Sequence, residues 1–177
     1  MHYSSVRKYL KPYRIVSQRK TTIVNAFASA IAPNDDYDEQ RVREAVAALG
    51  QDPDRDLRCA YCGALAESWD HVHATVRGAE FSGHGHRLGN LLPCCKKCNS
   101  AKGNKEWRNF LAEGKLDASA QEATANRIEE YLARFSFQES VPENSPEYQK
   151  LQRIKAKILA LCAEADQLAK LIRDKAI

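Results

Sequence analysis

The 177-residue chain lacks any apolar run long enough to cross a membrane, and its first twenty residues, MHYSSVRKYLKPYRIVSQRK, are basic and polar. A membrane span needs about twenty consecutive apolar residues, and a secretory signal needs a shorter apolar core. We therefore expect no membrane association and a reducing cytoplasmic location, where disulfides are rare. Internal repeats, low-complexity stretches and helicase, ATPase or methyltransferase signatures are also missing.

Acidic residues are absent from residues 1–33, which contain six Lys or Arg. Residues 34–57 reverse this balance with eight acids and three bases, and residues 58–105 are again positive with seven bases and three acids. Basic side chains that neutralise phosphates release counterions and give salt-sensitive binding. A single lysine is as readily explained by a solvated helix face, but the cluster predicts contact with nucleic acid. The predicted contacts are Arg87, Lys96, Lys97, Lys102 and Lys105.

Four of the six cysteines form two CxxC pairs, Cys59/Cys62 and Cys95/Cys98. One tight CxxC turn can present two thiolates to a metal at about 2.3 Å, and structural zinc takes four such ligands. The spacing therefore predicts a structural zinc site, with two redox pairs or unrelated cysteines as the weaker alternatives. Cys94 could replace Cys95, although Cys95 gives both halves the same turn. Cys162 lies in a helical pattern and is predicted to be a buried thiol that acts as a small apolar residue.

Residues 59–105 contain, in order, CAYCG, WDHVH and GNLLPCCKKCNSAKGNK. This order resembles the HNH endonucleases, whose ββα-metal fold places a hairpin and a helix around a metal ion. The resemblance implies that Asp70 is a metal ligand on the first strand and that His71 is the general base. It further implies that Asn90 braces the hairpin and orients the histidine. Asn99 would complete the metal site where the family name has its second histidine, which makes this an HNN variant.

Such a site would hydrolyse phosphodiester bonds. A histidine with its usual pKa near 6.5 is suited to accept the proton of the attacking water at neutral pH. A divalent cation would stabilise the charge on the phosphate and on the departing 3′ oxygen. Asp70 and Asn99 offer oxygen ligands, which suit Mg²⁺ or Mn²⁺ better than zinc. Asp70 and His71 are neighbours on the expected strand, so their side chains should point to opposite faces, which is consistent with the separate roles that the resemblance implies.

Three further histidines lie near this motif. His73 would share a strand face with His71, so it is either an extra ligand or phosphate contact or, more simply, a solvated side chain. His84 and His86 belong to the glycine-rich stretch SGHGHRLG. That stretch could approach a nucleic-acid backbone, or it could only connect the hairpin.

The flanking segments have helical patterns. Helices are expected in 17–32, in 35–50 ending at Gly50, and around Ile128 and Phe135. Trp107, Phe110 and Leu111 are expected to continue the site helix. We therefore predict a mostly α, α+β protein in which a small zinc-stapled ββα-metal centre, residues 58–114, is flanked by helical regions 1–57 and 115–177.

The C-terminal segment has an apolar stripe at alternating spacings of three and four residues. Ser145 and Pro146 are predicted to be the N-cap and the first position of its helix. The stripe from Leu151 to Ile172 is typical of a coiled coil. Residues 146–175 could therefore pair with a second copy or a partner protein, or pack on helices of the same chain.

Three functions agree with these observations. The leading one is a metal-dependent DNA endonuclease that leaves 5′-phosphate and 3′-hydroxyl ends, in restriction or another form of phage defence. The second is a noncatalytic zinc module that binds nucleic acid or a protein. The third is a nuclease subunit that cuts only when a partner recruits it. The sequence favours duplex DNA as the substrate but leaves RNA and single-stranded DNA open.

Overall fold

A computed structural model describes residues 2–141 and 143–175 of the chain. The chain divides into two compact units, one formed by residues 31–141 and one by the described parts of 1–30 and 142–177. The predicted mostly α, α+β class is confirmed. The division differs from the predicted boundaries after residues 57 and 114, because helices on both sides of the central segment contribute side chains to its core.

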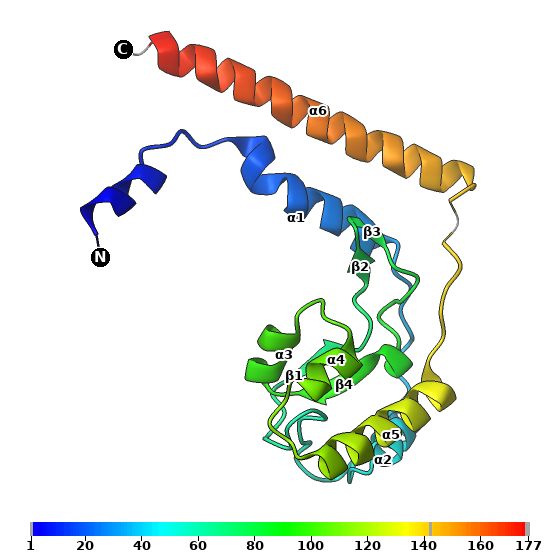
Figure 1. The fold of residues 1–177 in the computed structure, drawn as a ribbon. Helices are drawn as coiled ribbons and strands as arrows, with labels where there is room; N and C mark the ends of the chain where they lie inside the picture. The colour runs from blue at the N-terminus through cyan, green and yellow to red at the C-terminus, as the bar shows by residue number, and fades with distance from the viewer. Residues whose placement is uncertain (1, 142, 176–177) are drawn as a thin grey trace. The chain divides into compact units, whose positions relative to one another are not determined.

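The unit formed by residues 31–141 is built around a short antiparallel pair of strands (Figure 1). β1 (Ser68–His71) pairs with β4 (Leu91–Cys94), so that Asp70 lies opposite Leu92. The connection between them contains a second antiparallel pair, β2 (Val76–Arg77) with β3 (Glu80–Phe81), and the 3₁₀ helix η2 (Leu88–Asn90). Helix α3 (Lys96–Lys102) follows β4 at once. The strands and this helix thus have the predicted ββα order.

Helix α3 ends earlier than the sequence suggested. Gly103 has φ 49°, a left-handed conformation that favours glycine and stops the helix. A separate helix, α4 (Trp107–Ala112), then begins, because the Glu106 side chain accepts hydrogen bonds from the first backbone N–H groups. The prediction that Trp107, Phe110 and Leu111 continue the site helix is therefore wrong.

Two longer helices complete this unit. α2 (Glu39–Ala48) begins after the cap Asp38 and ends just before Gly50, which has φ 71° and was predicted to terminate it. α5 (Ala118–Phe135) begins at the cap Asp117 and covers the predicted helix around Ile128. Its Tyr131 hydroxyl donates hydrogen bonds to the backbone oxygens of Leu88 and Leu91. These hydrogen bonds link α5 to η2 and to the first residue of β4.

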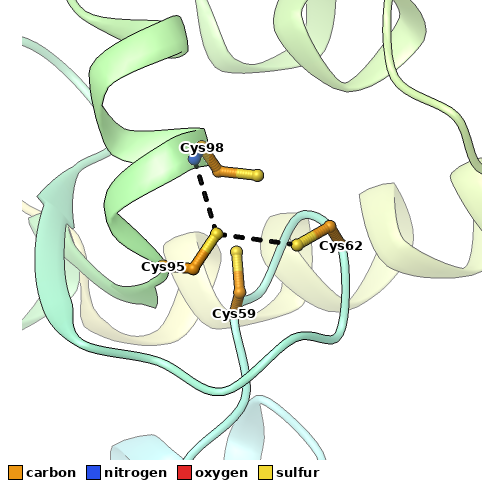
Figure 2. A group of neighbouring side chains, drawn as sticks. All are labelled: Cys59, Cys62, Cys95 and Cys98. Atoms are coloured by element: carbon orange, nitrogen blue, oxygen red, sulfur yellow. Dashed lines mark hydrogen bonds between the residues drawn. The ribbon is translucent and has the colours of Figure 1, made fainter.

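The loop before β1 and the start of α3 meet at four cysteines. Cys59 and Cys62 come from the loop, whereas Cys95 is the N-cap of α3 and Cys98 lies in its first turn (Figure 2). The two CxxC turns are thereby brought together across the hairpin.

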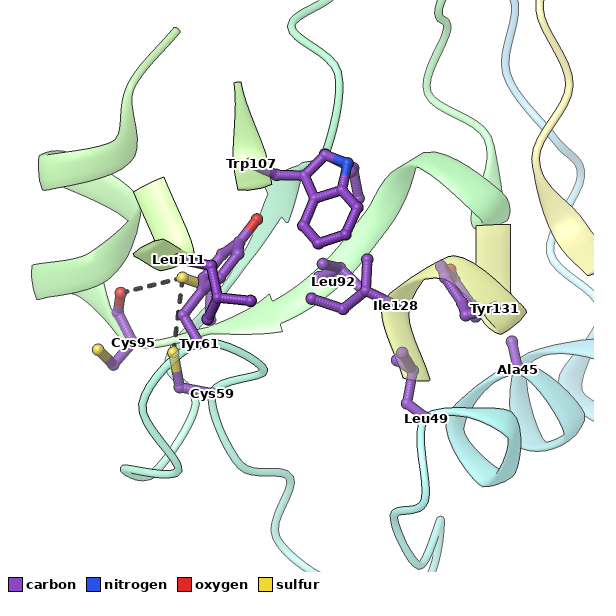
Figure 3. Close-up of a cluster of buried hydrophobic side chains, with 12 residues drawn as sticks. Ala45, Leu49, Cys59, Tyr61, Leu92, Cys95, Trp107, Leu111, Ile128 and Tyr131 are labelled. Carbon is purple, nitrogen blue, oxygen red and sulfur yellow. Dashed lines mark hydrogen bonds between the residues drawn. The ribbon is translucent and has the colours of Figure 1, made fainter. Parts of the chain in front are cut away.

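The hydrophobic core lies directly beside these cysteines. Figure 3 shows side chains from α2, β4, α4 and α5 gathered next to Cys59 and Cys95. Trp107, Leu92 and Ile128 are each at most 2% exposed. The full cluster contains Ala45, Leu49, Cys59, Tyr61, Val72, Leu92, Cys94, Cys95, Trp107, Leu111, Ile128 and Tyr131. A core of this size gives only limited stability. A metal bound by the cysteines would add to it.

The second unit contains η1 (Tyr3–Lys8) and two long helices that lie side by side, α1 (Ile15–Ala30) and α6 (Pro146–Lys175). Asp166 of α6 accepts hydrogen bonds from the backbone N–H groups of Ile15 and Val16, which satisfies the free end of α1. Ser145 caps α6 by accepting from the backbone N–H of Tyr148, as predicted. Among the described residues, no helix combines the length and the apolar character that crossing a membrane requires.

Candidate functional site

The four cysteines of the two CxxC pairs form one cluster. Their sulfur atoms all lie within 4.8 Å of one another, and those of Cys62 and Cys95 are 3.8 Å apart (Figure 2). A tetrahedron with metal–sulfur bonds of about 2.3 Å has sulfur–sulfur edges of about 3.8 Å. The donor set and spacing therefore fit a metal ion such as zinc.

Cys94 lies next to this cluster but outside it. It is fully buried, and its sulfur is 3.8 Å from that of Cys59. This contact lowers the pKa of the Cys59 thiol, with burial opposing it, and the same contact together with burial raises the pKa of the Cys94 thiol. The four sulfur atoms that lie within 4.8 Å of one another include that of Cys95 and not that of Cys94, so Cys95 is the one placed to be a ligand, as the equal CxxC turns favoured.

Cys162 stands apart on α6 and is only partly buried. Among the described residues, it belongs to no group of side chains that could hold a metal ion.

The Asp70 carboxylate points into the protein. It is 4% exposed and accepts a hydrogen bond from the Tyr61 hydroxyl at 2.8 Å. The Lys102 ammonium, whose side chain is 0% exposed, lies 3.0 Å from the same carboxylate and donates to the backbone oxygen of His71 at 2.7 Å. Burial and the nearby Asp70 carboxylate raise the pKa of Tyr61, so its hydroxyl remains a donor. A buried ion pair therefore joins β1 to the last turn of α3.

This arrangement does not leave Asp70 open to a second cation. Asn99, the other expected ligand, donates its side-chain N–H to Ser68 Oγ at 3.0 Å and lies on the same helix as Lys102. Its Oδ1 has no hydrogen-bond partner among the described residues and could bind a cation, but the Asp70 oxygens are already engaged. As they stand, Asp70 and Asn99 together do not fit a bound Mg²⁺ or Mn²⁺.

Asn90 is a buried brace in the connection that precedes β4. Its side-chain N–H group donates to the backbone oxygens of His73 and Gly85, at 2.9 and 3.0 Å. Its Oδ1 accepts from the backbone N–H of His73 at 2.8 Å. Asn90 thus joins the end of β1 to the loop that carries His86.

His71 lies on the opposite face of β1 from Asp70 and is half-buried. Its Nε2 atom is 3.0 Å from Nδ1 of His86. Burial lowers the pKa of His71, and the neighbouring His86 lowers it further. The imidazole is therefore neutral near pH 7, the state in which it can accept a proton.

The contact between His86 and His71 was not predicted from the sequence. The sequence of a glycine-rich loop does not indicate where its histidine side chains point. His73 and His84 form a different pair, with stacked rings whose centroids are 4.3 Å apart. Burial is the main cause of a lowered pKa for both.

The predicted phosphate contacts fall into two groups. Arg87 is held by Asp35 and Glu139, and Lys102 is buried against Asp70, so neither is available to nucleic acid as the side chains stand. Lys96 and Lys105 lie on the surface in exposed pairs with Glu67 and Glu113. Lys97 is exposed and has no ion-pair partner among the described residues. The surface part of the predicted set is thus Lys96, Lys97 and Lys105.

Comparison of the chain with protein-family models, with curated proteins and with solved structures finds no match.

Replacing Cys95 by serine should release the metal and unfold the site, because a three-thiolate set no longer completes the tetrahedron. The matched variant Cys94→Ala should keep one metal per chain. Metal analysis of the purified proteins, with circular dichroism for folding, measures both. Metal loss in Cys94→Ala together with full retention in Cys95→Ser would reverse this ligand assignment.

Replacing Lys102 by methionine should lower the free energy of unfolding by about 3–5 kcal/mol, because Asp70 would remain buried without its counter-charge. Lys97→Met, on the same helix but exposed, is the control and should leave stability unchanged. Urea denaturation of the metal-loaded proteins measures the difference. A loss below about 1 kcal/mol would mean that the pair behaves as an exposed one.

Proposed function

We propose that the protein is a metal-dependent DNA endonuclease that leaves 5′-phosphate and 3′-hydroxyl ends. The observation that carries the proposal is the placement of His71 on a ββα unit stapled by four cysteines. His71 is half-buried, and its Nδ1 has no hydrogen-bond partner among the described residues. A neutral imidazole with one free nitrogen is suited to take a proton from water.

The proposed reaction is the hydrolysis of one phosphodiester bond. A water molecule attacks phosphorus while its proton passes to Nδ1 of His71. The bond from phosphorus to the 3′ oxygen breaks, and that oxygen takes up a proton from the solvent to become the 3′-hydroxyl, while His71 returns its proton to the solvent. The phosphate stays on the 5′ carbon of the neighbouring nucleotide.

The cation requirement in this proposal rests on the motif resemblance. Mg²⁺ or Mn²⁺ would supply positive charge for the phosphate when bound. Asn99 offers a free side-chain oxygen, but Lys102 holds the Asp70 carboxylate. We therefore assign no step to the ion and leave the metal requirement to experiment.

The ion in the cysteine cluster is proposed to be zinc, with a structural role. All four ligand positions belong to the protein, and a closed tetrahedral site leaves no open position for substrate. The cluster joins the loop that carries Tyr61 to the helix that carries Lys102. Zinc would therefore set the geometry of the site without touching the reacting atoms.

Duplex DNA is the proposed partner of the surface beside α3. Lys96, Lys97 and Lys105 lie on or just after this helix, and exposed ion pairs such as those of Lys96 and Lys105 are weak enough to exchange for phosphates. Phosphate contacts of this kind position a protein on the duplex without reading its sequence.

A second function is favoured by the buried pair of Asp70 and Lys102. Because this carboxylate is closed to a cation, the same unit could be a noncatalytic zinc module that binds nucleic acid or another protein. The two functions differ in one measurable respect: the noncatalytic module binds duplex DNA but never cuts it with Mg²⁺ or Mn²⁺.

The third proposal concerns residues 146–175. Ile154, Leu161 and Leu168 repeat every seven residues along α6 and are 44%, 54% and 55% exposed, although α1 lies beside this helix. An exposed apolar row at heptad spacing supports pairing with a second copy or with a partner protein. A dimer would bring two sites to the two strands of a duplex.

Incubation of the wild-type protein with supercoiled plasmid and Mg²⁺ or Mn²⁺ should give nicked or linear DNA, and EDTA should abolish cleavage. His71→Ala should remain folded and metal-loaded but lose cleavage by at least about 100-fold, because general-base catalysis contributes roughly 10²–10⁴ in rate. Gel electrophoresis of the products measures both. A folded, zinc-loaded wild-type protein that binds the plasmid but does not cut it would favour the noncatalytic module.

Lys97→Ala should weaken binding to duplex DNA of any sequence. The slope of log affinity against log salt concentration should also fall by roughly 0.9 for one lost phosphate contact. Arg55→Ala, which changes an exposed base in the acidic segment, is the matched control. Fluorescence anisotropy over a range of salt concentrations measures both slopes. Equal slopes for wild type and Lys97→Ala would exclude this face of α3 from the interface.

A further inference from the structure

His71 and His86 are joined by a specific contact between ring nitrogens. Nε2 of His71 lies 3.0 Å from Nδ1 of His86, within the range of an N–H···N hydrogen bond. The rings meet edge to face, with centroids 5.0 Å apart and planes at 70°. This arrangement directs one nitrogen of each ring at the other.

The backbone of His86 is fixed on the side that precedes it. Its N–H group donates to the backbone oxygen of Pro33 at 2.7 Å, and the backbone N–H of Asp35 donates to its carbonyl oxygen at 3.4 Å. A Cβ atom at Gly85 would lie 2.2 Å from the Pro33 oxygen, so only glycine permits this close approach. The Gly85 carbonyl also accepts from the buried side chain of Asn90.

The side that follows His86 is held by ion pairs. Arg87 donates from Nη1 to Asp35 at 2.7 Å and from Nε to Glu139 at 2.5 Å. The second oxygen of Asp35 accepts from the backbone N–H of Leu88 at 2.9 Å. Burial opposes ionisation of Asp35, but these hydrogen bonds outweigh it and lower its pKa. The backbone that carries the His86 imidazole is therefore held in place on both sides.

The direction of the hydrogen bond follows from the work that His71 has to do. A general base needs an unprotonated nitrogen facing its substrate water, and a neutral imidazole carries its one proton on the other nitrogen. The nitrogen of His71 that has no partner is Nδ1, so the proton belongs on Nε2. His86 must then accept at Nδ1 and carry its own proton on Nε2.

We infer that His86 is the positioning residue for His71. Its Nδ1 accepts the Nε2 proton of His71, fixes the ring orientation, and leaves Nδ1 of His71 as the basic nitrogen. The direction of the hydrogen bond and its catalytic consequence rest on the proposed nuclease function, whereas the contact between the two ring nitrogens does not. This role resembles that of the third group in a catalytic triad, which orients a base without touching the substrate.

The chain supplies its own matched control. His84 belongs to the same loop, but its ring stacks on His73 and makes no ring-nitrogen contact with His71. Among substitutions of His86, asparagine places an oxygen near the position of Nδ1 and can still accept the proton. Glutamine places its amide one bond further out, and alanine has no acceptor.

The first test measures the hydrogen bond by NMR, without requiring cleavage. Long-range ¹H–¹⁵N spectra of the full-length, metal-loaded protein, at mildly alkaline pH where imidazoles are neutral, locate each ring proton. We expect the His71 proton on Nε2, with a scalar coupling across the hydrogen bond to Nδ1 of His86. The slowly exchanging proton should persist in His86→Asn and His84→Ala but be lost in His86→Ala and His86→Gln. A His71 proton on Nδ1 in the wild type would overturn the assignment.

The second test measures cleavage kinetics of the same variants. His86→Ala and His86→Gln should lower kcat by about 10- to 100-fold with KM changed by less than about threefold, the range found when a partner that orients a histidine is removed. His86→Asn should recover most of the loss, and His84→Ala should match the wild type. A kcat for His86→Ala within about threefold of wild type would overturn the positioning role.

The two proposals fail in different ways. A wild-type protein that never cuts DNA, but has the expected coupling, would overturn the nuclease function and leave the His86 contact established. A protein that cuts but has no such coupling would overturn the His86 assignment alone.

Discussion

The surroundings of Asp70 depend on the contact among four sulfur atoms. Two cysteines belong to the loop that carries Tyr61, and two belong to the first turn of α3. From these two pieces the protein builds the surroundings of Asp70: the tyrosine comes from the loop, and Lys102 comes from the end of the helix. A metal bound by the sulfur atoms would hold the loop and α3 together. Its binding free energy would add to the folding stability that so small an apolar core provides.

The two faces of β1 carry different chemistry. Asp70 faces inward, where a buried ion pair joins the strand to the helix, and burying such a pair demands near-complete hydrogen bonding. His71 faces the other way, with one nitrogen bound to His86 and one without a partner in the described part of the chain. The inward face is therefore structural as it stands, whereas the outward face has the properties of a site that can take a proton. This separation keeps both a nuclease and a noncatalytic zinc module physically reasonable.

Local patterns in the sequence predicted the local features of the structure. The CxxC spacing predicted the four-cysteine cluster, and Ser145 was correctly predicted to cap α6. The ββα order was expected from the motif resemblance, and the hydrophobic periodicity predicted only the flanking helices. The prediction of one continuous site helix was wrong because the apolar spacing continues past Gly103 while the backbone does not. The catalytic roles of His71, Asp70, Asn90 and Asn99 stay predictions.

What could not be predicted is pairing across long stretches of chain. Lys102 looks like its exposed neighbours in a lysine-rich helix, and only the fold reveals that its side chain is buried against a carboxylate 32 residues away. Arg87 likewise pairs with Asp35 and Glu139, which are each 52 residues away in the sequence. No periodic pattern in the sequence predicts either partner. His86 depends on the same pairs, since they set where its loop runs. Charge counts along the sequence cannot separate such internal pairs from bases that face solvent.

The central claim, that four sulfur ligands hold the site together, is tested most directly by X-ray absorption at the zinc edge of the purified full-length protein. The account predicts one zinc per chain with four sulfur atoms at about 2.3 Å in its first shell. A first shell containing nitrogen or oxygen, or a folded protein that holds no metal and has its thiols free or paired as disulfides, would contradict it.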